Sequence, residues 1–178
     1  MSTIRIEHEV AIRRPRADVF AFISDHDHRP AWTNGVSRVK RTTAGPIGVG
    51  TTYTVVGRSM GRRVESTYEL TEYEPSSRFA GRLSSKLFTV DETYVFDDSE
   101  GETTVRLTAD ATPGRALRLL GPLLGFAVDR QIQGDHQRLK KILERRRRKR
   151  PQPVDPAVDP AAEPAAEPTA EPEAVTEG

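Results

Sequence analysis

The feature that most constrains the fold is a series of short alternating segments followed by one long amphipathic segment. Between residues 36 and 111, apolar and polar residues alternate in runs that are separated by Gly, Pro, Asn, Asp and Ser. Such runs are typical of β-strands joined by tight turns. Parallel crossovers need a dozen or more residues, so this spacing predicts an antiparallel sheet. The predicted strands are residues 36–41, 51–56, 64–73, 79–83, 88–97 and 102–111.

The N-terminal region predicts one further strand and a short helix. Residues 3–13 alternate, with His8 on the otherwise apolar face. Pro15 suits the first turn of a helix, and Val19, Phe22 and Ile23 give that helix a buried stripe. A polar loop over residues 24–31 then leads to Trp32, the only tryptophan.

The C-terminal part of the domain predicts a long helix over residues 122–148, about 40 Å at 1.5 Å per residue. Its apolar positions recur at helical spacing and must be covered by the sheet, because a soluble helix of this length does not stand alone. The stripe comprises Leu117, Leu120, Leu124, Val128, Ile132, Leu139 and Ile142; it begins before this helix and is interrupted near Pro122, where the helix restarts.

The composition divides the chain near residue 150. Residues 151–178 contain seven of the 26 acidic residues, seven of the 13 prolines and none of the 27 Lys and Arg. This segment lacks the apolar residues that a core needs, which predicts a disordered acidic tail. Residues 1–150 are long enough for one domain with a substantial core.

Several classes of protein are excluded or disfavoured. Without cysteine the chain has no disulfide, no thiolate metal site and no Cys nucleophile. The N-terminus lacks an apolar signal core, and no run approaches the ~18 apolar residues of a spanning helix. These features predict a cytoplasmic protein, and the excess of Arg over Lys, with abundant Ala and Pro, indicates a bacterial source with a GC-rich genome.

Three segments resemble a known family. They are PRADVFAFISDHDHRPAW (15–32), YELTEYEPSSRF (68–79) and GETTVRLTAD (101–110), followed by the long helix. This arrangement resembles the polyketide cyclase/dehydrase-type members of the START/Bet v 1-like (SRPBCC) superfamily over about residues 3–147. Family members carry an Asp shortly before a Trp, matched by Asp25 and Trp32. They also carry a Tyr-x-Pro turn, matched by Tyr73 and Pro75.

The resemblance implies an α+β helix-grip fold. In this fold a seven-stranded curved antiparallel sheet wraps around the C-terminal helix, and two short helices lie between the first two strands. A curved sheet laid against one helix encloses more volume than backbone can fill. We therefore expect an internal apolar cavity for a small hydrophobic molecule.

Two titratable residues on inward-facing positions are candidates for chemistry. Glu92 shares a face with apolar residues, and a buried carboxylate is costly unless it is paired. It could act as a general acid or base or hold a polar ligand group; alternatively a bulge turns it outward, or an Arg neutralises it. His8 could bind a ligand or move a proton, or it could be a core histidine.

Large side chains on the same faces are candidates for lining the cavity. Tyr53, Tyr68 and Tyr94 combine an apolar ring with one hydroxyl group, and Phe96 shares a face with Tyr94. Trp32 could gate the cavity mouth or pin the short helices to the sheet. Core packing explains all of these residues equally well.

No cofactor or metal is expected. The run from Asp25 to His28 resembles metal ligands in composition, but consecutive loop residues rarely converge on one ion. Gly57 to Gly61 is too short for a phosphate-binding loop, and no nucleophile-elbow motif is present. His136 falls near the stripe of the long helix and could face the cavity or be structural.

The six cations from Arg145 to Arg150 form the strongest charge feature. They could bind nucleic acid or an anionic membrane, or simply offset the dipole at the end of the helix. The sequence leaves three functions open: a binding protein for a hydrophobic lipid, polyketide-like or aromatic molecule; a cyclase/dehydratase-like enzyme of the lyase or isomerase kind; and an interaction protein that uses the basic helix end. It also leaves open whether the protein is a monomer or a homodimer.

Overall fold

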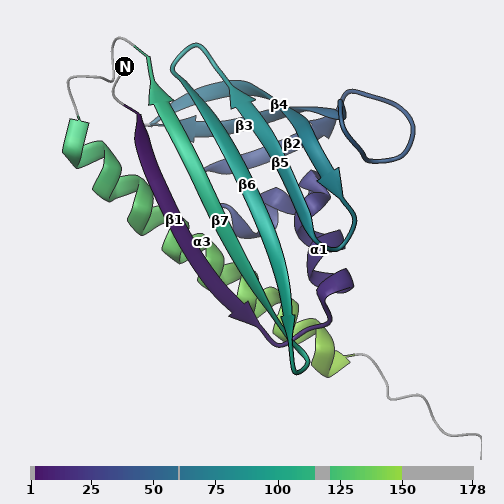
Figure 1. Ribbon diagram of the computed structural model, residues 1–178. Helices are drawn as coiled ribbons and strands as arrows, with labels where there is room; N and C mark the ends of the chain where they lie inside the picture. The colour runs from purple at the N-terminus through teal and green to yellow at the C-terminus, as the bar shows by residue number, and fades with distance from the viewer. Residues whose placement is uncertain (1–2, 60, 115–120, 150–178) are drawn as a thin grey trace, which may run out of the picture.

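Seven antiparallel strands form one curved sheet, and a long helix runs along it (Figure 1). The computed structural model describes residues 3–59, 61–114 and 121–149, with the side chains of residues 121–124 and 146–149 outside the description. The strands are β1 (Ile4–Ile12), β2 (Val36–Arg41), β3 (Thr52–Ser59), β4 (Arg62–Glu74), β5 (Arg78–Ser84), β6 (Phe88–Ser99) and β7 (Glu102–Pro113). The helices are α1 (Arg16–Ser24), the 3₁₀ turn η1 (His26–His28), α2 (Arg29–Trp32) and α3 (Gly121–Lys149).

The strand order is β1-β7-β6-β5-β4-β3-β2, so β2 to β7 form a meander. The short helices carry the chain from β1 at one edge of the sheet to β2 at the other. This confirms the predicted helix-grip fold. Among the described residues, no helix is long and apolar enough to cross a membrane.

The core lies between the concave face of the sheet, α1 and the C-terminal half of α3. Inward positions on the strands alternate with exposed ones, as the period of two predicted. The buried aromatic side chains gather under α1 and η1, where Phe20 makes edge contacts with Phe79 and Phe96. Leu139 and Leu143 of α3 close this part of the core.

The two halves of α3 differ in burial. Asp135, His136, Leu139 and Leu143 are buried, whereas Val128 and Ile132 in the first half are only partly covered and Phe126 is 69% exposed. The predicted stripe is therefore confirmed in its C-terminal part. Its members Leu117 and Leu120, the side chain of Leu124 and the predicted acidic tail (residues 151–178) lie outside the described residues.

Candidate functional site

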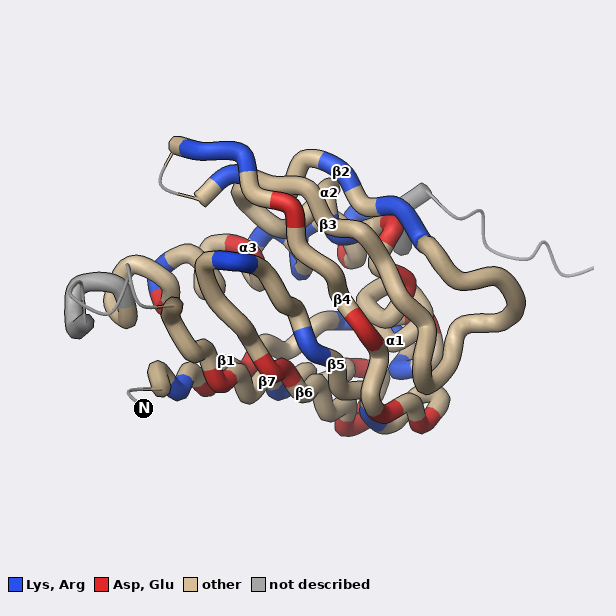
Figure 2. Tube along the Cα trace, turned by 90° about the horizontal axis from the view of Figure 1, so that it is seen from above, with Lys and Arg blue, Asp and Glu red and all other residues tan. Residues whose placement is uncertain are grey.

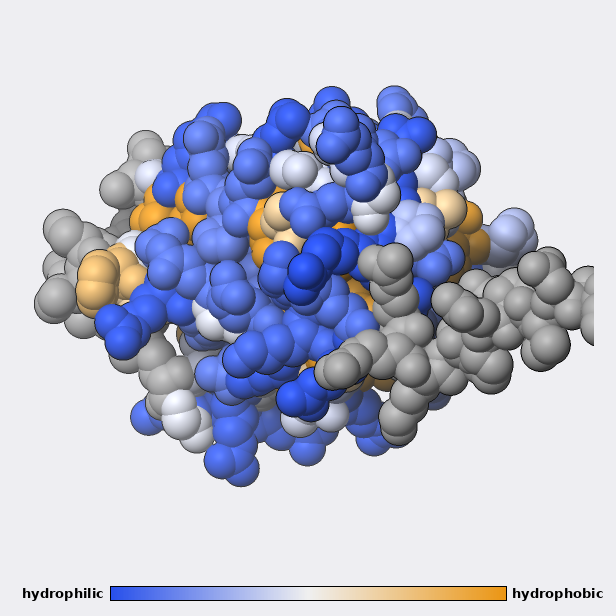
Figure 3. Space-filling model, turned by 90° about the horizontal axis from the view of Figure 1, so that it is seen from below, coloured by the Kyte–Doolittle hydropathy of each residue, from blue (hydrophilic) through white to orange (hydrophobic). Residues whose placement is uncertain are grey.

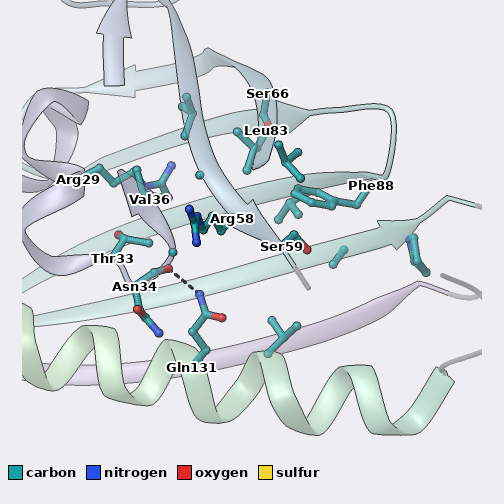
Figure 4. A pocket seen from close by; sticks show the side chains of 18 of the residues that line it. Arg29, Thr33, Asn34, Val36, Arg58, Ser59, Ser66, Leu83, Phe88 and Gln131 are labelled. Carbon is teal, nitrogen blue, oxygen red and sulfur yellow. Dashed lines mark hydrogen bonds between the residues drawn. The ribbon is translucent and has the colours of Figure 1, made fainter. Parts of the chain in front are cut away.

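A cavity of about 280 Å³ lies between the sheet and the N-terminal half of α3 (Figure 4). Its wall is mostly apolar, with polar groups on the side of the α2–β2 turn. The lining residues are Ile4, Arg29, Thr33, Asn34, Gly35, Val36, Val55, Gly57, Arg58, Ser59, Val64, Ser66, Leu83, Phe88, Val90, Ala111, Pro113, Val128 and Gln131.

The cavity exists because the inward side chains become smaller along β3 and β4. Under α1 the inward positions hold large rings, which fill the space between sheet and helices. Towards the other end of the same strands they hold smaller side chains, so the space stays open. The clearest series are Tyr53, Val55 and Gly57 on β3, and Tyr68, Ser66 and Val64 on β4.

The α2–β2 turn forms one wall of the cavity and is fixed to two elements. The backbone N–H of Asn34 donates to Asp135 Oδ1 at 2.8 Å, and Gln131 Nε2 donates to the Asn34 carbonyl at 2.9 Å (Figure 4). On the sheet side, a Cβ at Gly57 would lie 2.4 Å from the carbonyl oxygen of Gly35. Glycine at position 57 is therefore what lets the turn approach β3 this closely.

Arg29 of α2 and Glu92 of β6 form a buried ion pair at the inner wall. Arg29 Nη2 lies 2.6 Å from both carboxylate oxygens of Glu92, and each residue is 8% exposed. Burial alone would lower the pKa of Arg29, but the charge and hydrogen bonds of Glu92, together with the nearby Tyr94 and Tyr68, outweigh it and the pKa is raised. Because Arg29 lines the cavity, the pair presents a guanidinium group to any guest.

The structure thus selects among the alternatives for Glu92. The residue faces inward in a regular ladder, opposite Gly81 and Ala109, so no bulge turns it outward. Arg29 neutralises Glu92, which was one of the alternatives for this residue. Its part in chemistry or ligand binding stays a prediction.

His26 is a buried histidine that the sequence did not indicate. Its Nδ1 lies 3.0 Å from the carbonyl oxygen of Ser24, which can only accept, so Nδ1 carries the proton. Nε2 then holds a lone pair, 4.0 Å from Glu92 Oε1 and without a hydrogen-bond partner among the described residues. Burial, and next the charge of Arg29, hold the pKa of His26 well below its usual value.

Loop geometry decides which histidine of the 25–28 run enters the core. Asp25 accepts a hydrogen bond from the Asp27 backbone N–H, which caps η1 and turns His26 inward between Tyr53 and Tyr68. His28 instead stacks on Phe22 near the surface. Both histidines occupy equally polar sequence surroundings, so no local signal distinguished them.

The predicted cavity-lining rings lie in the packed core. Tyr53, Tyr68, Tyr94, Phe96 and Trp32 are at most 3% exposed, and they are not among the described residues that line the cavity. Burial raises the pKa of Tyr53 to about 12. The Arg29 guanidinium lies over the rings of Trp32 and Tyr68, and the contact of these five rings with a ligand stays a prediction.

His8 lies outside the cavity and meets His136 instead. The Nδ1 atoms of these residues are 2.5 Å apart, between β1 and α3. Burial, and next the proximity of His8, lower the pKa of His136 to about 3. His136 is 1% exposed and packs against Trp32, in agreement with the structural alternative for this residue.

The remaining features of the sequence are its possible metal ligands and the basic run from Arg145 to Arg150. Among the described residues, no group of three or more His, Asp or Glu could hold a metal ion. Of the run from Arg145 to Arg150, only the exposed side chain of Arg145 is described, so polyanion or membrane contact there stays a prediction.

The comparisons with known proteins agree on the fold. The chain is similar to the ZhuI aromatase/cyclase from Streptomyces sp. R1128, with 16% identity and a TM-score of 0.71 over 83% of this chain and 98% of that one. It is also similar to a START superfamily protein from Mycobacterium smegmatis, with 11% identity and a TM-score of 0.66 over 79% and 97%. A third similar structure, Ara h 8.0201, shows 16% identity and a TM-score of 0.62 over 80% and 98%.

At the level of sequence, no curated protein matches this chain. A family profile described as "Polyketide cyclase / dehydrase and lipid transport" matches residues 3–144. That match spans every strand, the short helices and most of α3. The chain therefore belongs to the polyketide cyclase/dehydrase and lipid transport family.

Proposed function

We propose that this protein binds a hydrophobic small molecule, such as a lipid, a polyketide-like compound or an aromatic metabolite, in the cavity beside α3. The observation that carries the proposal is the cavity itself, close to the lower end of the volume range of ligand sites, about 300 Å³. On the face shown in Figure 3, hydrophobic residues form only small areas between hydrophilic side chains.

Burial of apolar surface would supply the affinity. Each 100 Å² of ligand surface removed from water contributes about 2.5 kcal/mol, from which the cost of immobilising the guest is subtracted. The polar side of the cavity would set orientation. The Arg29 guanidinium and the Thr33 hydroxyl can donate to a carbonyl or hydroxyl oxygen of the guest.

Native mass spectrometry of freshly purified protein tests the proposal. We expect a bound apolar compound with the wild type and its loss when Ala111→Trp fills the cavity from β7. Ala31→Trp, the same change on an exposed position of α2, is the matched control and should keep the compound. An empty wild-type cavity, with no thermal shift across a lipid and aromatic panel, would contradict binding.

A cyclase/dehydratase-like activity is the second candidate. Such chemistry needs at least two convergent titratable groups. A chain of contacts favours it: His26 Nε2 lies 4.0 Å from Glu92 Oε1, and Glu92 accepts from Arg29, which lines the cavity. In this proposal the neutral His26 takes the α-proton of a β-hydroxyacyl compound while Arg29 stabilises the developing oxyanion, and the proton then leaves with the β-hydroxyl group as water.

A β-hydroxyacyl thioester is a suitable probe, because dehydration gives a conjugated product that is followed by its absorbance. The enzyme proposal expects turnover by the wild type, a large loss with His26→Gln and little change in thioester binding. Thioester that binds without turnover would leave the protein as a carrier.

A further inference from the structure

A surface groove of about 710 Å³ opens beside the cavity, where two strands separate. β4 begins at Arg62, but its ladder with β5 starts only at the pair Thr67 and Ser84. Before that pair, the first residues of β4 and the β5–β6 turn diverge. The groove between them is lined by residues 62–67 and 84–87.

The groove and the cavity share two lining residues. Val64 and Ser66 of β4 line both. The cavity and the groove therefore adjoin at these two side chains, with the cavity as the dry end beside α3 and the groove as the wet end at the surface.

The groove end of this site carries positive charge. Arg62, Arg63 and Lys86 line the groove, and Arg58, which pairs with Arg63 across the hairpin, lines the adjoining cavity. Figure 2 shows Lys and Arg gathered at the free end of the β3–β4 hairpin. Glu65 is the acidic residue of the groove wall.

These cations differ from other arginines on the sheet surface. Arg78, Arg82 and Arg106 each form an ion pair with a carboxylate on a neighbouring strand. Within the described part of the chain, Arg58, Arg62, Arg63 and Lys86 form no ion pair. Their charge is thus available to an anion. The hydroxyl groups of Thr67 and Ser84 add hydrogen-bonding capacity at the same edge.

We propose that the guest of this protein is an amphipathic anion, with its apolar body in the cavity and a carboxylate or phosphate group in the groove. This inference rests on the proposed binding function and specifies its ligand class. An ionised group is too costly to bury among valines and Phe88, so it stays at the wet end. There, exposed cations can make charge-assisted hydrogen bonds to it.

Calorimetric titration of the full chain with decanoate, decyl phosphate and 1-decanol tests this assignment. These probes share one apolar body and differ in the head group. At low salt we expect at least one of the anions to bind about tenfold more tightly than the alcohol, a preference that shrinks as salt screens the groove. The anion that binds better identifies the head group as carboxylate or phosphate.

The double variant Arg62→Gln/Arg63→Gln should remove most of the anion preference and leave 1-decanol affinity unchanged. Arg78→Gln/Arg82→Gln, which removes two paired arginines, is the control and should keep the preference. If the alcohol and the anions bind equally to the wild type, or if the double variant keeps the preference, the proposed anion site in the groove is refuted. The proposal that the cavity binds a hydrophobic molecule is then kept. If none of the three probes binds, both proposals fail.

Discussion

Breaking the buried pair of Arg29 and Glu92 should destabilise the protein far more than breaking an exposed pair. Glu92→Leu leaves a guanidinium group that is 8% exposed and has lost both of its 2.6 Å contacts to carboxylate oxygens. Removing one partner of a buried ion pair costs about 3–5 kcal/mol. Arg29→Met should cost about as much, because it leaves the carboxylate unpaired.

The double variant Arg29→Met/Glu92→Leu distinguishes charge from packing. Replacing a whole buried pair by apolar side chains of similar size is often neutral or stabilising. We therefore expect the double variant to be several kcal/mol more stable than the two single losses added together. Trp32 lies against Arg29, with the guanidinium carbon 5.9 Å from the ring centroid. Its fluorescence can follow unfolding in urea.

The exposed pair of Arg82 and Asp91 supplies the control. Its side chains are 58% and 52% exposed, so Arg82→Gln should change the free energy of unfolding by less than about 1 kcal/mol. If Glu92→Leu costs as little as Arg82→Gln, the reasoning is refuted. Arg29 would then be solvated from the cavity and free to contact a guest directly.

Three further outcomes follow from single contacts. Gly81→Ala places a Cβ 2.1 Å from the Tyr68 hydroxyl oxygen, so the ring must shift, and the loss should be about 1–3 kcal/mol in urea unfolding. Gly57→Ala meets the Gly35 carbonyl at 2.4 Å; it should displace the α2–β2 turn and weaken guest binding, and unchanged affinity would contradict this. His136 has a folded pKa of about 3 against about 6.5 when unfolded, so the unfolded state takes up the proton first. The contribution of His136 to stability is therefore full above pH 6.5 and lost as pH falls towards 3. It should account for about 2 kcal/mol of the loss between pH 7 and 5, so His136→Gln should lose that much less over this range, while the loss due to the buried His26 remains.

Local patterns in the sequence were sufficient for the strands and the long helix, but the loop predicted over residues 24–31 was wrong, because η1 and α2 form there. The prediction of residues 36–41 coincides with β2, and the other strands differ by a few residues at their ends. β3 continues to Ser59 and β4 begins at Arg62, beyond the predicted residues 51–56 and 64–73. The hairpin arms there are polar, so backbone pairing extends them without an apolar signal.

Of the buried charged and titratable residues Glu92, Arg29 and His26, the sequence indicated only Glu92. Glu92 stood out because a charge on an apolar face of a strand is costly. Arg29 and His26 did not, because they lie in a polar loop where charge is expected. Their burial depends on a partner 63 residues further along the chain from Arg29 and on the turn capped by Asp25.

The apolar pattern along the chain thus determined the strands and their inward faces, through a repeat of 2.0 residues. A repeat of 3.6 residues determined where the long helix lies. Only the tertiary structure decided where the interior stays empty. That depends on which inward side chains α3 and the short helices cover, and on how small side chains from separate strands line up. It placed the cavity beyond the tyrosines that the sequence had indicated, next to a guanidinium group and a groove of unpaired cations.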